Sequence, residues 1–277
     1  MIVLDELASM LAKARLSKRR ITGLSAEQVS KLTMEDGYSV MKKTTKLLEA
    51  EKGWNVAGFK VGATSKAAQQ RMGMNGPFWG TLFEPSKVVA SHRGGNIPRF
   101  SISQDLIRGI ETEFAFNIKK DITPRNNPYT AEELVMDHCS TVIPCVEVCG
   151  SRVPVDFAGS APLLIADTGN TAVVFPSDSF ARSAADVYKD LPSSKATMFI
   201  DGVQVAEGSG AEVLGSPVSA LEWLVKEVCG LHGMTIPQGS FVITGATSGL
   251  KPITSTCYVH AGFSGISKAD IHIAFRE

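Results

Sequence analysis

The sequence predicts an α+β protein in which a helical segment precedes a β-rich core. Three observations support this class. Apolar residues recur at helical spacing over the first fifty or so positions, the apolar runs after Gly53 shorten to strand length, and Gly, Pro and Asn/Asp clusters separate those runs. We therefore expect a helical N-terminal segment over residues 1–53 and a β-rich core over residues 54–277.

Three helices account for the first segment. The apolar stripe of the first helix is Leu4, Leu7, Leu11 and Ala12. Ser25-Ala-Glu-Gln is a capping box that begins the second helix. The third runs from about Met34 to near Gly53, and its inner stripe is Val40, Thr44, Leu47 and Leu48.

Short apolar runs after Gly53 predict the strands of the core. These runs are Val56–Val61, Ile110–Ile118, Val142–Cys149, Leu163–Ala166, Ala172–Phe175, Thr197–Val205, Phe241–Thr244, Cys257–Val259 and Ile271–Phe275. Ile200-Asp-Gly-Val is typical of a type I′ hairpin turn. Helices are expected over Lys66–Met72 and from Ser216 to Gly230, where Ser216-Pro217 caps the start.

Composition excludes several classes of protein. The 277 residues carry 28 Lys+Arg and 28 Asp+Glu, a balance that argues against nucleic acid or a membrane surface as partner. No apolar run approaches ~18 residues, and Met1–Leu7 lacks the basic start of a signal peptide. Five cysteines without a CxxC pair indicate reduced thiols, and Cys145 and Cys149 lack the second pair of a thiolate metal site. We expect a cytoplasmic protein.

Acidic residues interrupt two of the predicted strands. Glu111 and Glu113 point to the same face because a strand has a period of two. An amphipathic strand with its polar side in water would give the same pattern. Glu147 has apolar residues at both neighbouring positions and at both i±2 positions, so neither face of its strand is expected to be exposed to solvent. Its buried carboxylate therefore needs a partner. That partner is either Arg152 in a structural ion pair or a bound cation.

Two further ionisable residues lie within or at the end of an apolar run. Lys60 lies in a short apolar strand and needs an anion, from the protein or from a substrate. Asp167 ends an apolar run before a glycine, where an acid can be simply a turn former. Three glutamates and one lysine leave two negative charges, which a divalent cation would cancel. Carboxylate oxygens favour Mg²⁺ or Mn²⁺, and the open coordination positions would suit a chelating 2-oxo acid.

Several short segments of the sequence, taken in their order along the chain, match the motifs of a known family. They are Gly58-Phe-Lys-Val-Gly-Ala-Thr-Ser, Gly80-Thr-Leu-Phe, Ile110-Glu-Thr-Glu-Phe-Ala-Phe, Ile143-Pro-Cys-Val-Glu-Val, Ser151-Arg-Val, Ile165-Ala-Asp, Gly208-Ser-Gly-Ala-Glu-Val-Leu-Gly-Ser-Pro, Ala220-Leu-Glu-Trp-Leu and Gly239-Ser-Phe-Val-Ile-Thr-Gly. In this order they resemble the hydratase/decarboxylase branch of the fumarylacetoacetase-like superfamily, which includes 2-oxopent-4-enoate hydratase and 4-oxalocrotonate decarboxylase. The likeness spans the whole chain.

The resemblance carries expectations about the site. It implies a mixed β-roll core, a homo-oligomer, and Mg²⁺ or Mn²⁺ held by Glu111, Glu113 and Glu147. It also implies catalytic roles for Lys60 and Asp167. The substrate contacts it implies are Thr64, Ser65, Leu82, Thr168 and Thr247.

The expected activity is that of a metal-dependent lyase of aromatic-compound catabolism. It would hydrate a small 2-hydroxy-2,4-dienoate to a 4-hydroxy-2-oxo acid, or decarboxylate a 4-oxalocrotonate-type acid at the same site. Two alternatives remain: acylpyruvate hydrolysis, for which His92 is the candidate base, and a non-catalytic β-rich binding protein. The chain departs from the family pattern at Gly150, where an acid is usual, at Thr168-Gly-Asn170, where Asn-Ala-Ser is usual, and over Thr244–Lys251, where a Gly-Ser-Leu-Thr stretch is usual.

Overall fold

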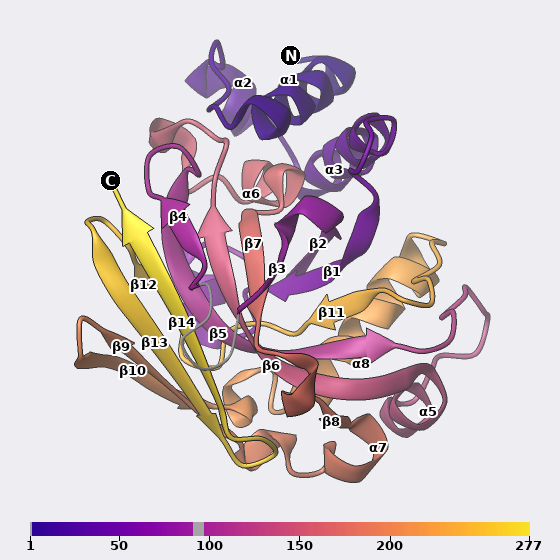
Figure 1. Ribbon diagram of the computed structural model, residues 1–277. Coiled ribbons are helices and arrows are strands. Elements are labelled where there is room, and N and C mark those ends of the chain that lie inside the picture. Colours follow the sequence, from indigo (N-terminus) through magenta and orange to yellow (C-terminus); the bar gives the residue numbers. More distant parts are fainter. Residues whose placement is uncertain (1, 91–96) are drawn as a thin grey trace.

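The computed structural model describes residues 2–90 and 97–277. Its helices are α1 Leu4–Ser17, α2 Ala26–Ser30, α3 Met34–Glu49, α4 Lys66–Arg71, α5 Ala131–Glu133, α6 Ala161–Asp167, α7 Ala184–Val187 and α8 Pro217–Val225. Its strands are β1 Val56–Gly62, β2 Phe78–Phe83, β3 Lys87–Val89, β4 Arg99–Ser101, β5 Ile107–Ile118, β6 Cys139–Gly150, β7 Asn170–Phe175, β8 Arg182–Ser183, β9 Lys195–Ile200, β10 Val203–Ser209, β11 Phe241–Ile243, β12 Lys251–Pro252, β13 Cys257–Ser264 and β14 Ala269–Arg276. The α+β class with N-terminal helices is confirmed (Figure 1).

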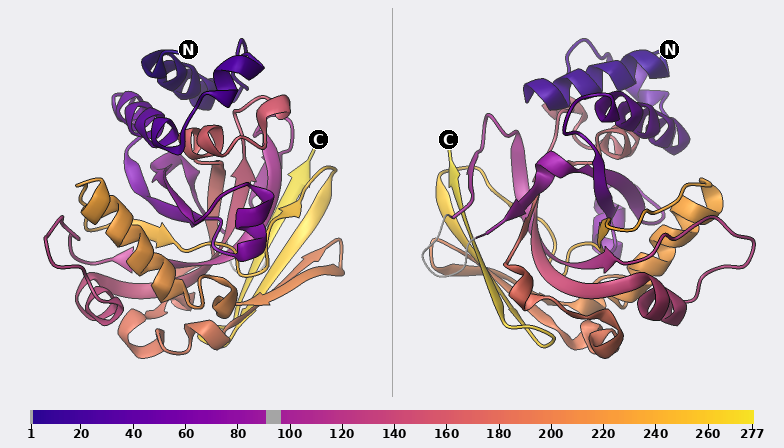
Figure 2. Two further views of the ribbon diagram at one scale, coloured as in Figure 1. Left: turned by 180° about the vertical axis from the view of Figure 1, so that it is seen from behind. Right: turned by 45° about the vertical axis from the view of Figure 1, so that its right-hand side comes forward.

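The larger sheet curls into a roll. Its main strand order is β2-β1-β11-β5-β6-β7-β3, with parallel and antiparallel neighbours. β2 and β3 are joined only by the short turn Glu84–Ser86, yet they stand at opposite ends of that order. The chain therefore links the two edges and draws the sheet round on itself, as the right-hand view of Figure 2 shows.

Both faces of the rolled sheet are covered. Phe114 and Val146, on the outer face of β5 and β6, belong to the main core with Val259 and Ile271 of the second sheet. That sheet has the order β10-β9-β13-β14-β4 and stands against the roll in Figure 1. Within the roll, apolar residues of several strands form a separate cluster, which includes Ala57, Leu82, Ala115, Ile143 and Cys145. A charged side chain on the inner face is therefore cut off from bulk water unless a cavity reaches it.

The N-terminal helices pack at one end of the roll (Figure 1). Ser25 and Thr33 form the capping boxes of α2 and α3, as residues with a side-chain acceptor at the N-cap do. Leu7 and Leu11 of α1 share a buried cluster with Val40 of α3 and Leu163 of α6. Helix α3 ends at Glu49, earlier than predicted, and Leu47 of the predicted inner stripe is 44% exposed.

One predicted strand is wrong. Leu163–Ala166 lies in helix α6 and not in a strand. Pro162 stands in the first turn of that helix, where its missing N–H has no cost, and Thr168 ends it in the left-handed region at φ 62°. An apolar run of four residues has no period that distinguishes the two structures. Asp167 consequently ends a helix.

The remaining predicted elements are confirmed with small shifts of boundary. The predicted turn at Asp201-Gly202 joins β9 and β10, and both residues have positive φ, as a type I′ turn requires. Ser216 caps α8 by accepting from the amide of Val218. Over the described ranges 2–90 and 97–277, no helix has the length and apolar character needed to cross a bilayer.

Candidate metal and substrate site

Two glutamates face each other across the longest strand pair of the roll. Glu111 of β5 lies directly opposite Glu147 of β6, and Glu113 lies opposite Cys145. Side chains of directly opposed residues leave the sheet on the same face, with Cβ atoms ~4.5–5.5 Å apart. Two negative charges in that position repel each other, so this strand pair requires a compensating cation.

Lys60 supplies part of that compensation. Its Nζ donates to Oε1 and Oε2 of Glu147 at 2.5 and 2.7 Å, and the two side chains are only 5% and 0% exposed. The amide of Asn170 adds a third hydrogen bond, to Glu147 Oε1 at 2.9 Å. Burial lowers the pKa of Lys60, but the nearby carboxylates, Glu147 first, more than offset this and leave that pKa above its ordinary value. Lys60 is therefore a cation at neutral pH.

Arg152, the alternative partner considered for Glu147, pairs elsewhere. Its Nε donates to Asp167 Oδ1 at 2.7 Å. The sequence interpretation of Glu147 and Arg152 as an ion pair is therefore wrong. A curled sheet brings β1 close enough to β6 for Lys60 to take that place, which sequence spacing does not reveal.

Glu113 is fully buried and only half satisfied. Its Oε2 accepts the backbone N–H of Gly245 at 2.7 Å, whereas its Oε1 is buried without a hydrogen-bond partner among the described residues. Gly245 has φ 105°, and a Cβ there would stand 2.5 Å from Oγ1 of Thr64. Only glycine lets this loop come close enough to donate its amide to Glu113.

Glu111, Glu113 and Glu147 together form what we call the acidic group. Two of them, Glu111 and Glu113, hold their protons more tightly than free glutamates do. Burial first, and the charge of Glu147 next, raise the pKa of Glu111 to about 7, although Lys60 and Arg71 act in the opposite direction. Burial and the same neighbours raise the pKa of Glu113 well above its ordinary value. Both shifts reflect burial first, and then the negative charge of the neighbouring carboxylates, which Lys60 only partly offsets.

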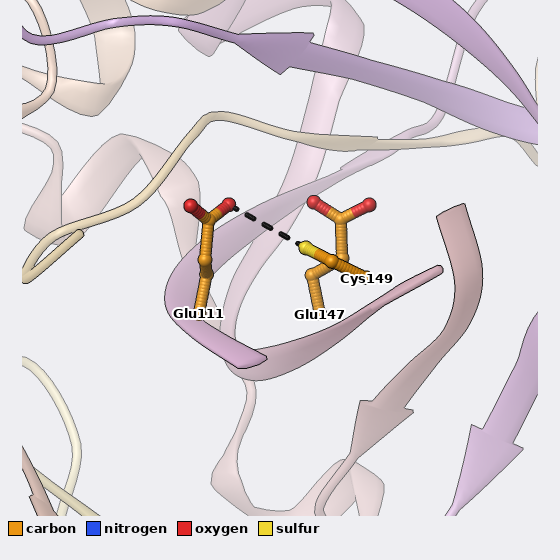
Figure 3. A group of neighbouring side chains, drawn as sticks. All are labelled: Glu111, Glu147 and Cys149. Atoms are coloured by element: carbon orange, nitrogen blue, oxygen red, sulfur yellow. Dashed lines mark hydrogen bonds between the residues drawn. The ribbon is translucent and has the colours of Figure 1, made fainter. Parts of the chain in front are cut away.

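Cys149 joins the acidic group. One ligand atom each from Glu111, Glu147 and Cys149 lies within 4.8 Å of the others (Figure 3). The thiol points toward Glu111 Oε2 at 3.8 Å. Sequence reasoning had set this residue aside because Cys145 and Cys149 lack a second cysteine pair, although Cys149 follows Glu147 by two positions and must share its face. Cys145, by contrast, belongs to the apolar cluster inside the roll.

These side chains fit a divalent cation. Glu111 and Glu147 oppose each other, Glu113 keeps a buried oxygen with no described partner, and the three carboxylates exceed Lys60 by two charges. Carboxylate oxygens are the donors that Mg²⁺ and Mn²⁺ prefer. Of the three predicted ligands, Glu111 and Glu147 belong to the group of described residues whose possible ligand atoms lie within 4.8 Å of one another, and Cys149 is its third member. Glu113 is not part of that group, so Glu111, Glu113 and Glu147 as the residues that would hold the ion stay a prediction.

A cavity of about 370 Å³ opens beside this group. It is lined by four of the residues singled out from the sequence: Lys60, Thr64, Ser65 and Glu111. Arg71, Arg108, Cys149, Ser151 and Leu164 line it as well, and sequence reasoning had not selected them. Its volume is at the lower end of the range for small-molecule sites.

Asp167 lies outside the lining of this cavity, although a catalytic role was expected for it. Its carboxylate accepts from Nε and the backbone N–H of Arg152, at 2.7 and 3.0 Å. Arg15 approaches the same carboxylate at 3.9 Å and donates to the backbone oxygen of Asp167 at 2.7 Å. Because the carboxylate is held by two arginines and is almost fully buried, the structure does not bring it together with Lys60.

Three residues expected to contact substrate also lie outside the lining. Leu82 packs in the apolar cluster inside the roll. Thr168 accepts from Arg15 at 3.0 Å, and Thr247 donates to the backbone oxygen of Thr112 at 2.9 Å. All three are buried. His92, the candidate base for a hydrolase, lies outside the described residues.

Two departures from the family pattern have a visible counterpart. A Cβ on Gly150 would stand 1.9 Å from Oγ1 of Thr171, so this position accepts no side chain while that threonine is present. Asn170 donates to Glu147, as described above, and its Oδ1 is buried without a partner among the described residues. Both residues therefore shape the surroundings of Glu147 and Cys149.

Comparison with known proteins identifies relatives along most of the chain. A 2-hydroxypent-2,4-dienoate hydratase from Pseudomonas putida is 30% identical over 224 residues, which covers 80% of this chain and 94% of the relative. A 4-oxalocrotonate decarboxylase from Pseudomonas sp. (strain CF600) is 29% identical over 235 residues, with 85% of this chain and 83% of that one covered. No family model matches the chain.

Solved structures share the fold. A 4-oxalocrotonate decarboxylase from Pseudomonas putida G7, complexed with magnesium and adipate, superposes with a TM-score of 0.82 at 25% identity and covers 100% of this chain and 98% of its own. A yeast fumarylacetoacetate hydrolase family protein reaches 0.56 at 15% identity over 79% of this chain and 92% of its own, a likeness of fold alone. The chain therefore belongs to the family of 2-hydroxypentadienoate hydratases and 4-oxalocrotonate decarboxylases, and it shares the fold of fumarylacetoacetate hydrolase family proteins.

Proposed function

We propose that this protein is a divalent-metal-dependent lyase that hydrates a small 2-hydroxy-2,4-dienoate, by way of its 2-oxo-4-enoate form, to a 4-hydroxy-2-oxo acid. One observation carries the proposal: the opposed carboxylates of Glu111 and Glu147, with Glu113 behind them, exceed Lys60 by two charges beside a cavity of ligand size. The related hydratase named above and the magnesium complex of the related decarboxylase support it.

The chain's own residues take three roles in this proposal. Glu111, Glu113 and Glu147 hold Mg²⁺ or Mn²⁺, which when bound would act as a Lewis acid toward the 2-oxo acid end of the substrate. Lys60, cationic and aimed at Glu147, presents positive charge where the enolate oxygen develops. Thr64 and Ser65 line the cavity, and apolar residues such as Leu164 limit water in the remainder.

Asp167 is proposed to act indirectly. By accepting from the backbone and guanidinium of Arg152, it holds the chain next to Ser151, which lines the cavity. It is therefore a positioning residue, and the proton transfers of the reaction are left to groups that reach the cavity.

Decarboxylation of a 4-oxalocrotonate-type acid is the second candidate. The full-length superposition on the Pseudomonas putida G7 decarboxylase favours it. Both reactions pass through the same stabilised enolate, so one site can serve either. Measuring CO₂ and 4-hydroxy-2-oxo acid after incubation with Mg²⁺ and either 2-hydroxypenta-2,4-dienoate or 4-oxalocrotonate would separate the two reactions.

The decisive variants are Lys60→Ala and Glu147→Gln. Each should remove most of the turnover, followed as loss of dienol absorbance, while circular dichroism shows a retained fold. Lys46→Ala and Glu49→Gln, exposed substitutions of the same kind, should leave the rate unchanged. Wild-type rates in both site variants would refute the site. Absence of turnover and of metal binding in the wild type would favour a non-catalytic protein.

We further propose a cytoplasmic homo-oligomer that acts in aromatic-compound catabolism. The five cysteines are free thiols, which supports a reducing compartment. Light scattering coupled to gel filtration would test the oligomer, and a monomer at micromolar concentration would contradict it.

A further inference from the structure

The thiol of Cys149 reaches the cavity and has no role in the proposed reaction. Its side chain lines the cavity, and its sulfur lies 3.8 Å from Oε2 of Glu111. Figure 3 shows this sulfur beside the carboxyl groups of Glu111 and Glu147. Each of the three residues offers one ligand atom, and these atoms lie within 4.8 Å of one another. A cysteine therefore belongs to the group of side chains that would receive a cation.

A second cysteine on the same strand face is placed differently. Cys145 precedes Glu147 by two positions, as Cys149 follows it by two, so both thiols share the face of that carboxylate. Cys145 nevertheless packs in the apolar cluster inside the roll. Among the cysteines of the described ranges, Cys149 alone lines the cavity. An ion that enters the cavity can therefore meet the sulfur of Cys149 and the carboxylates together.

A buried oxygen beside this group points independently to a cation. Glu113 leaves β5 on the same face as Glu111, and its side chain is 0% exposed. Its Oε1 has no hydrogen-bond partner among the described residues. Lys60, the cation in contact with a carboxylate here, donates to Glu147. The positive charge that Glu113 and Glu111 require must therefore come from a bound ion.

The kind of ligand atom selects the kind of cation. Oxygen ligands suit Mg²⁺ and Mn²⁺, whereas a thiolate favours softer ions such as Zn²⁺, Co²⁺ and Cd²⁺. When such an ion binds, a sulfur–metal bond replaces the S–H bond of Cys149, and the proton leaves to solvent. Tetrahedral bonds of about 2.0 Å to oxygen and 2.3 Å to sulfur place the two ligand atoms about 3.5 Å apart. The observed 3.8 Å between Cys149 Sγ and Glu111 Oε2 requires little adjustment.

We propose that Cys149 is a ligand for a thiophilic divalent cation, of the class of Zn²⁺, Co²⁺ and Cd²⁺, which binds to its Sγ and to the carboxylates of Glu111 and Glu147. The inference rests on the metal site of the proposed function and shares two of its residues. It adds a sulfur ligand, and it makes the sulfur the reason why these ions bind more tightly than Mg²⁺. A thiophilic ion and Mg²⁺ therefore compete for one site.

Cobalt spectroscopy tests for the sulfur ligand directly. Metal-free wild-type protein titrated with Co²⁺ without oxygen should develop a sulfur-to-cobalt charge-transfer band in the near ultraviolet, and Cys149→Ser should lack it. Cys257→Ser, which changes a half-buried cysteine outside the cavity lining, should keep the band. Circular dichroism checks the fold of both variants. Wild-type protein that binds no Co²⁺, or binds it without the band, would overturn the inference whether or not the variants fold.

Affinities measured by calorimetry test the selectivity. Cys149→Ser should weaken Cd²⁺ binding by about tenfold or more, because a neutral hydroxyl replaces the thiolate, and should change Mg²⁺ affinity by less than about threefold. Excess Mg²⁺ should weaken the apparent Cd²⁺ affinity of the wild-type protein. Equal Cd²⁺ affinities in the two proteins would contradict the sulfur ligand. So would an equal loss of affinity for both ions, since the substitution would then have disturbed the whole site.

The outcomes separate this inference from the proposed function. If the dienoate is not turned over with Mg²⁺ or Mn²⁺ but the cobalt band appears, the proposed function fails and the inference holds. If turnover with Mg²⁺ is observed and the band is absent, the inference alone fails.

Discussion

At the scale of single residues, the main feature of the site is the excess of negative charge on its buried glutamates. Glu147 is fully buried and is tied to Lys60 by two short hydrogen bonds, while Glu111 faces it directly across the strand pair. Removing one member of a buried pair leaves an uncompensated charge, which is far more costly than losing a surface ion pair. The consequences of substitution therefore depend on which charge is removed.

Lys60→Met should destabilise the metal-free protein by roughly 3–5 kcal/mol, because the buried carboxylate of Glu147 loses the cation that contacts it. The double variant Lys60→Met/Glu147→Gln should recover part of this loss, since it removes one of the opposed charges. Urea unfolding in the presence of EDTA measures both values. Lys46→Met, at an exposed position, should change stability by less than about 0.5 kcal/mol. A Lys60→Met protein as stable as this control would contradict the charge argument.

The pKa of Glu111, about 7, predicts how stability depends on pH. Its folded pKa is above the unfolded value near ~4.3, so the folded protein binds more protons between these limits. Stability of the metal-free protein should therefore fall as pH rises from about 4.5 to 7. Glu111→Gln should flatten this part of the profile. The measurement is the midpoint of urea unfolding at several pH values, and an equally steep profile in the variant would exclude Glu111 as the cause.

At the scale of elements, two helices and a curled sheet bring the site together. Lys60 belongs to β1 and Glu147 to β6, and β11 and β5 stand between these strands in the sheet order. Their contact exists because the sheet rolls up. Helix α6 ends in Asp167, whose pairing with Arg152 and Arg15 ties α1, α6 and the chain after β6 together.

The division of the chain at residue 53 stays a prediction, since the N-terminal helices share a core with α6.

Asp167→Asn should weaken this junction. A buried carboxylate that loses its charge beside two arginines should cost roughly 3–5 kcal/mol of stability. If the residue acts by position, KM should rise while kcat of the folded protein stays within about tenfold of wild type, in contrast to Lys60→Ala. Asp167→Glu, which keeps the charge, should recover part of the stability. A kcat loss as large as that of Lys60→Ala, with unchanged stability, would instead make Asp167 a catalytic residue.

At the scale of the whole molecule, a bound cation should couple activity to stability. The carboxylates that would hold it come from two different strands of the roll, so the ion favours the folded chain over the unfolded one. A ligand that binds only the folded state at a hundred times its Kd stabilises it by about 2.7 kcal/mol. The same ion is required by the proposed reaction.

Removal of the metal should therefore lower the melting temperature and abolish turnover together. Dialysis against EDTA, followed by Mg²⁺ or Mn²⁺, should restore both, and the gain in melting temperature should be larger at pH 8 than at pH 5.5 because protons compete for Glu111. Glu147→Gln protein should show little gain at either pH. Full activity in EDTA would contradict a metal-dependent mechanism.

The sequence by itself determined a great deal here, because it contains local periodicity and ordered motifs. A strand's period of two placed Glu111 and Glu113 on one face, and the wholly apolar surroundings of Glu147 predicted its burial, which is complete. The change from helical to strand spacing after Gly53 predicted the fold class. The ordered segments indicated the family to which the chain belongs.

Only the tertiary structure decided which charges meet. The curl of the sheet pairs Glu147 with Lys60 and leaves Arg152 for Asp167, a choice between partners that lie 87 and 5 positions from Glu147 in the chain. The tertiary structure also shows that Leu163–Ala166 lies in a helix and that Cys149, Arg71 and Arg108 line one cavity. Contacts between distant segments depend on how the sheet closes, and a pattern read along the chain holds no information about that closure.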